Sequence, residues 1–145
     1  MPWLTVRYSP GFQEDLTSWV LRISDDGHVR QEVYVHRFSP FEQFEETHRF
    51  LLSPAQMTQI EEAVALLDID EILKVESQYV IDDAELVRIT YNSDGKSLEF
   101  TSPMEHWLWR QSRGETLPAS IKGALALWCQ VQPLSQYKAR HASGA

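Results

Sequence analysis

The chain has 145 residues, of which 43% are hydrophobic and 23% charged, and this size suits one domain with its own core rather than two. Its 13 Lys and Arg against 21 Asp and Glu give a formal net charge of −8. This balance argues against a protein that binds nucleic acid or an anionic membrane by neutralising phosphates. We therefore expect one folded domain over residues 1–134 and a flexible polar tail over residues 135–145.

The N-terminus and the single cysteine indicate a cellular location. Residues 1–8 have no basic head followed by an apolar run and a cleavage site, which a signal peptide requires. Apolar runs of about five residues fall well short of the roughly 20 that a membrane span needs. One cysteine, Cys129, excludes an internal disulfide and is predicted to pack rather than to react. These features favour the cytoplasm.

Alternating hydrophobicity predicts strands in the first third of the chain, over residues 4–8, 19–24 and 28–35. The Asp25-Asp26-Gly27 turn should join the last two of these as a hairpin, because Asp-Gly tolerates the positive φ of a tight turn. We expect the first strand to pair with the second. Residues 47–52 show a weaker strand pattern.

A second hairpin is predicted over residues 86–101. Its strands, 86–91 and 97–101, flank a turn that contains Asp94-Gly95. The sheet should therefore be largely antiparallel, because tight turns join its neighbouring strands.

Three helices are predicted from their start signals and apolar stripes. Residues 54–67 follow a capping box at Ser53-Pro54-Ala55-Gln56, and a short helix from residue 104 to Gly114 follows a similar sequence at Ser102-Pro103. The last helix, over residues 118–132, starts at a proline. Four residues on the stripes of the two longer helices should be buried against the sheet: Val64, Leu67, Leu125 and Trp128.

These elements predict an α+β fold, with a largely antiparallel sheet of about five strands, two main helices packed on one face and one extra short helix. The other face of the sheet should be half solvated and suited to docking of a partner. The side chains expected there are polar: Arg22, Arg30, Arg88, Thr90 and Glu99.

No residue pattern indicates catalysis, a cofactor or a metal. None of the five histidines has a second histidine three or four residues away, and phosphate-binding, dinucleotide-binding and serine-hydrolase motifs are missing. Acidic clusters favour a solvated surface, with attraction of a basic partner as the next interpretation. They comprise Glu42/Glu45/Glu46, Asp68/Asp70/Glu71 and Asp82/Asp83/Glu85.

The strongest candidates for binding another protein lie in two aromatic segments. On the short helix, Trp107 and Trp109 stand about 200° apart, so that Trp109 should be exposed beside Arg110 and Arg113. The loop over residues 38–44 contributes a second set, Phe41 and Phe44. Either segment could instead be a local packing cluster.

The segment from Phe50 to Phe100 resembles the emfourin-like small bacterial proteins. The resemblance comprises the Leu-Ser-Pro-Ala helix start, an apolar run ending at Ile72-Leu73 and the Asp-Gly hairpin, with Pro10-Gly11-Phe12 and the Leu117-Pro118 helix as further similarities. That family includes inhibitors of thermolysin-like metalloproteases. Residues 36–49 and 103–116 depart from its compact pattern, and its inhibitory residues have no counterpart in this sequence.

These observations lead to the hypothesis of a non-enzymatic bacterial protein-binding module. It would be an inhibitor or immunity-type factor that engages another protein through an acidic surface with exposed aromatics, and would bind neither nucleic acid nor a membrane. Two alternatives remain open: a small metal-dependent or carboxylate-based hydrolase, and a ligand-binding domain with a Trp-lined groove.

Overall fold

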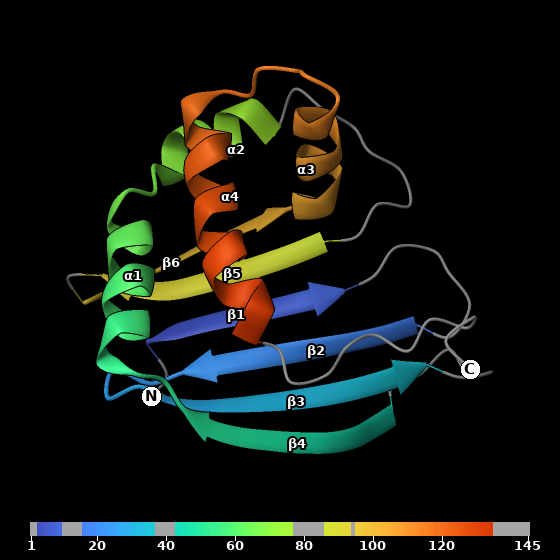
Figure 1. Cartoon of the computed structure of the whole chain (residues 1–145), viewed down its shortest axis with the longest axis vertical. Coiled ribbons are helices and arrows are strands. Elements are labelled where there is room, and N and C mark those ends of the chain that lie inside the picture. Colours follow the sequence, from blue (N-terminus) through green and yellow to red (C-terminus); the bar gives the residue numbers. More distant parts are fainter. Residues whose placement is uncertain (1–2, 10–15, 37–42, 77–85, 94, 135–145) are drawn as a thin grey trace.

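The computed structural model describes residues 3–9, 16–36, 43–76, 86–93 and 95–134, which form one open antiparallel sheet and a layer of helices (Figure 1). The order of strands across the sheet is β4-β3-β2-β1-β5-β6. The strands are β1 (Leu4–Ser9), β2 (Leu16–Ile23), β3 (His28–His36), β4 (Gln43–Leu51), β5 (Leu86–Ser93) and β6 (Lys96–Ser102). The helices are α1 (Pro54–Ala65), α2 (Ile69–Glu76), α3 (Met104–Ser112) and α4 (Ala119–Val131), followed by a 3-10 turn, η1 (Gln132–Leu134).

Both predicted hairpins are present, and each is closed by a glycine with positive φ. Gly27 joins β2 to β3 at φ 90°, and Gly95 lies between β5 and β6 at φ 74°. β1 pairs with β2, as expected, and also with β5, so the N-terminal strand lies inside the sheet. The weaker pattern at residues 47–52 belongs to β4, which gives the sheet six strands rather than about five. β4 pairs with β3, and the register of this pairing shifts between Val33 and Tyr34 of β3.

The helix predicted over residues 54–67 is α1, which ends two residues earlier than expected, and a second helix, α2, follows it without having been predicted. α1 starts with the predicted capping box, in which the Ser53 hydroxyl accepts from the Gln56 N–H at 3.1 Å and the Gln56 side chain accepts from the Ser53 N–H at 2.9 Å. α1 ends at Ala65, and α2 begins at Ile69. Asp68 caps the start of α2, because its carboxylate accepts a hydrogen bond from the Glu71 N–H at 3.1 Å. The sequence analysis did not predict α2, although Asp68 followed by Glu71 three residues later is a local signal of a helix start.

The prediction that Ser102 caps the short helix is wrong. α3 starts after Pro103 with no side-chain cap. The Ser102 hydroxyl instead accepts a hydrogen bond from the buried Trp107 indole N–H at 3.1 Å. Gly114, at φ 87°, follows the end of α3 as the sequence indicated. α4 begins after Pro118, also as predicted.

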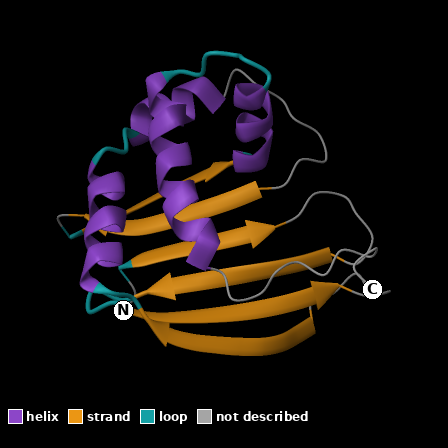
Figure 2. Cartoon of the chain, in the orientation of Figure 1, coloured by secondary structure: helices purple, strands orange, loops and turns teal. Residues whose placement is uncertain are grey.

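The helices lie over one face of the sheet, and the core is the layer between them (Figure 2). α1 and α4 cross the strands, whereas α2 and α3 lie near the β5/β6 edge (Figure 1). Val64, Leu125 and Trp128 are buried as predicted, but Leu67 is only half-buried because α1 ends before it. Ile72 of α2 is fully buried in its place.

The far side of the sheet, which we call the outer face, carries the polar side chains predicted for it. Arg30, Arg88 and Glu99 are exposed there.

The prediction that Cys129 packs in the core is wrong, because Cys129 is exposed. The tail predicted over residues 135–145 lies outside the described residues. Within the described ranges, no helix combines the length and apolar character needed to cross a membrane.

Candidate functional site

Helix α3 places its two tryptophans in opposite environments. Trp107 faces the core and is 1% exposed, whereas Trp109 is 52% exposed on the opposite side of the helix. Two residues advance an α-helix by about 200°, so one of these side chains must leave the core when the other enters it. The predicted exposure of Trp109 is confirmed.

The Trp109 indole is packed between two neighbours on the surface of α3. The guanidinium carbon of Arg113 lies 4.7 Å from the indole centroid, and the His106 ring centroid lies 5.8 Å away. A guanidinium over an aromatic face is attracted by about 0.5–1 kcal/mol at an exposed site. These contacts hold an apolar side chain in one orientation at the surface. We call the set His106, Trp109, Arg110 and Arg113 the α3 surface.

Arg110 is held by its own helix end. Its guanidinium lies 5.3 Å from the Trp107 ring centroid and donates to both carboxylate oxygens of Glu115, at 3.1 and 2.9 Å. Glu115 returns to this position because Gly114 turns the chain with positive φ and the Glu115 N–H donates to the Arg110 carbonyl. The hydrogen bond from Arg110 lowers the pKa of the Glu115 carboxyl. The Arg110 side chain is therefore largely covered by Trp107 and Glu115, and it offers a partner less contact than Trp109 or Arg113 does.

The second predicted aromatic segment lies mostly outside the described residues. Phe41 lies outside the described residues, and of Phe44 only the backbone is described, opposite Tyr34 in the β3/β4 pairing. β4 is one edge of the sheet, whereas α3 follows β6 at the opposite edge.

The acidic clusters have structural roles or lie beyond the described ranges. Asp68 caps α2, and Asp70 and Glu71 occupy the first helical turn, where they interact favourably with the helix dipole. Glu42, Asp82, Asp83 and Glu85 lie outside the described residues, and the side chains of Glu45 and Glu46 are also outside them. Among the described residues, no group of three or more His, Cys, Asp or Glu side chains could hold a metal ion.

Sequence reasoning missed a second surface, in which arginines gather on the outer face. Arg22 and Arg30 were predicted to be exposed there, but nothing in the sequence indicated that Arg49 lies beside them. The alternation of these arginines with buried residues was visible in the sequence and indicated that they are exposed. The pairing of the strands, which makes them neighbours, was not visible there. The chain matches no protein-family model and has no significant similarity to a curated protein.

Proposed function

We propose that this chain is a non-enzymatic protein-binding module that docks on its partner through the α3 surface. The observation that supports this most directly is the Trp109 indole, half-exposed on a helix whose other tryptophan is buried. Trp and Arg dominate the binding energy of protein interfaces. Because Arg113 and His106 already restrain the indole, binding would cost little side-chain entropy.

The chemistry of the α3 surface defines what the partner must offer. The indole requires an apolar pocket, and the Arg113 guanidinium beside it requires an acidic group at the rim of that pocket. Arg110 contributes less to this charge because it is paired with Glu115. The formal net charge of −8 favours a partner that is basic overall, since long-range attraction speeds association.

We further propose an inhibitor or immunity-type role in the bacterial cytoplasm. This proposal rests on the resemblance of the sequence to emfourin-like proteins, and the resembling segments include the capped helix α1, the β5/β6 hairpin and the final helix α4. The first partner to assay is therefore a thermolysin-like metalloprotease. Dose-dependent inhibition that is lost in Trp109→Ala would identify both the partner class and the surface. Inhibition that Trp109→Ala leaves unchanged would contradict the role of α3.

A second experiment tests the α3 surface without assuming a protease. A photocrosslinking amino acid is placed at Ser112, an exposed residue about one turn from Trp109 on α3, so that the indole itself is kept. The control position is Leu66, a 76% exposed residue that follows α1. We expect one partner to be crosslinked from position 112 and not from position 66. With that partner purified, Trp109→Ala should weaken binding at least about thirtyfold, or ~2 kcal/mol, whereas Leu66→Ala should not. Equal crosslinking from both positions, or equal affinities of both variants, would overturn the proposal.

A further inference from the structure

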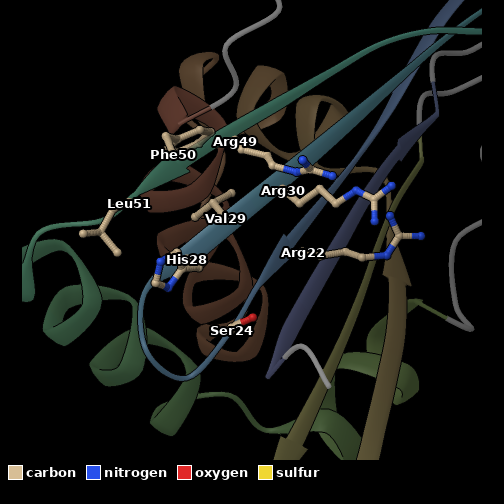
Figure 3. A pocket seen from close by; sticks show the side chains of 8 residues that line it. All are labelled: Arg22, Ser24, His28, Val29, Arg30, Arg49, Phe50 and Leu51. Carbon is tan, nitrogen blue, oxygen red and sulfur yellow. The ribbon is translucent and has the colours of Figure 1, made fainter.

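Three arginines form a row across the outer face, one on each of three adjacent strands. Arg22 of β2 lies directly opposite Arg30 of β3, and Arg30 lies directly opposite Arg49 of β4. Side chains directly opposite on neighbouring antiparallel strands have Cβ atoms about 4.5–5.5 Å apart. Figure 3 shows the three arginine side chains extending in the same direction, so that their guanidinium groups lie next to one another. We call Arg22, Arg30 and Arg49 the arginine row.

The arginine row has one carboxylate neighbour among the described residues, Glu32. Glu32 forms an ion pair with Arg22, and its Oε1 lies 4.0 Å from Nε of Arg30. The Tyr34 hydroxyl donates to its other oxygen at 2.8 Å, so this carboxylate is already shared among three groups. Arg49 is exposed and, within the described ranges, has no ion pair. Two guanidiniums of the row therefore share one carboxylate and the third has none within the described ranges, although the chain as a whole has a formal net charge of −8.

This arrangement costs stability in the unbound protein. Like charges directly opposite on neighbouring strands repel each other. An anion placed between them would remove that repulsion and would gain charge-assisted hydrogen bonds, which the planar guanidinium makes in pairs to phosphate and carboxylate groups.

The arginine row lines one side of a pocket of about 580 Å³. This volume lies within the range of about 300–1,000 Å³ that is typical of small-molecule sites. The remaining lining combines polar groups with apolar ones: Ser24, His28, Val29, Phe50 and Leu51. The Leu51 side chain is 62% exposed. Beside the turn between β2 and β3, Nδ1 of His28 lies 3.0 Å from a carboxylate oxygen of Asp26. A ligand could therefore place anionic groups on the arginines and an apolar part against Leu51.

We propose that this pocket binds a small molecule with two or more linked anionic groups, phosphates or carboxylates, and an attached ring or apolar part. Neighbouring arginines of the row are separated by one strand spacing, about 4.8 Å, which a diphosphate or a short dicarboxylate spans. This site lies on the outer face and does not depend on the α3 surface.

The test measures binding of four probes by isothermal titration calorimetry: inorganic pyrophosphate, ADP, citrate and a single-stranded oligonucleotide. Saturable binding of pyrophosphate and ADP, with ADP tighter, indicates a phosphate ligand with a ring. Tighter binding of citrate indicates a carboxylate ligand. Binding of none of the three small molecules, or stronger binding of the oligonucleotide than of any of them, would overturn the proposal.

Substitutions then locate the site. Arg30→Gln and Arg49→Gln should each reduce the affinity at least about tenfold, because each removes charged hydrogen bonds to the anion. The matched control is Arg88→Gln, on β5 of the same face, where Arg88 is paired with Glu99 at 3.4 Å and lines a different pocket. Its affinity should change less than about twofold. An equal loss in all three variants would indicate only a diffuse charge effect and would contradict a defined site.

A second readout separates binding from folding. Without ligand, Arg49→Gln should melt at or above the temperature of the parent protein, because one repulsive charge is gone. Saturating pyrophosphate or ADP should raise the melting temperature of the parent by more than that of Arg49→Gln, because the affinity of the variant is lower. A lower melting temperature of Arg49→Gln without ligand would show that Arg49 stabilises the fold and would overturn the argument from repulsion.

Discussion

The Trp107 indole N–H donates a hydrogen bond of 3.1 Å to the hydroxyl of Ser102, and both residues are buried. Trp107 lies on α3 and Ser102 ends β6, so this bond ties the helix to the strand that precedes it. A buried indole N–H without an acceptor is costly, which explains why a serine is present at a fully buried position.

Ser102→Ala should lower the free energy of unfolding by about 1–3 kcal/mol, because it leaves the indole N–H unsatisfied. Denaturant melts measure this loss, and Ser97→Ala, at an exposed position of the same strand, is the control. In a Trp107→Phe background the same change should cost much less, since no indole N–H remains. An equal cost in both backgrounds would contradict the assigned role of Ser102.

Ile72→Ala should lower the free energy of unfolding by about 2–5 kcal/mol, because Ile72 is fully buried beneath α2. Leu67→Ala should cost less, because that side chain is only partly buried. Leu73→Ala, at a 48% exposed position of the same helix, should stay within about 0.5 kcal/mol of the parent. If Leu67→Ala proves the most costly of the three, α1 and α2 are continuous after all.

Gly27→Ala should destabilise the protein by about 1–2 kcal/mol, because φ 90° is unfavourable for a residue with a Cβ. The added Cβ would lie 3.4 Å from the Leu52 carbonyl oxygen, an ordinary van der Waals contact, so the cost comes from the backbone. At Gly95, φ 74° is closer to the left-handed region that residues with a Cβ can adopt. Thermal melts of both variants should therefore rank Gly27→Ala as the less stable. The reverse order would place the β2/β3 turn differently.

The Glu115 carboxyl should titrate below its ordinary pKa of 4.5, because Arg110 donates two hydrogen bonds to its charged form. A folded-state pKa below the unfolded one means that the pair stabilises the fold above pH 4.5 and that this contribution is lost as the pH falls through the folded pKa. NMR titration of the carboxyl carbon measures the shift. In Arg110→Ala the pKa should return toward 4.5, and an unchanged value there would assign the shift to another group.

Local structure could be predicted where neighbouring residues determine it. The Ser53/Gln56 capping box and the Asp25-Asp26-Gly27 turn depend on contacts within three or four residues, which the sequence displays directly. The exposure of Trp109 belongs to the same class, since the helix period alone separates it from Trp107.

One feature of the fold was missed although a local signal for it exists, and another required tertiary packing. The start of α2 is marked by Asp68, whose carboxylate accepts from the Glu71 N–H three residues later. The pairing of β1 with β5 joins segments about 80 residues apart, and no local signal indicates which strand becomes the second neighbour of β1.

The sequence by itself determined most of the side chains that leave the core, Leu67 and Cys129 excepted, because a strand alternates every second residue and a helix turns every 3.6. It did not determine which of those side chains meet. Arg22, Arg30 and Arg49 are neighbours only because the registers of β2, β3 and β4 align them, and register is set by packing of the whole sheet. For the same reason α3 and β4 lie at opposite edges of the sheet, although the sequence predicted binding residues on both.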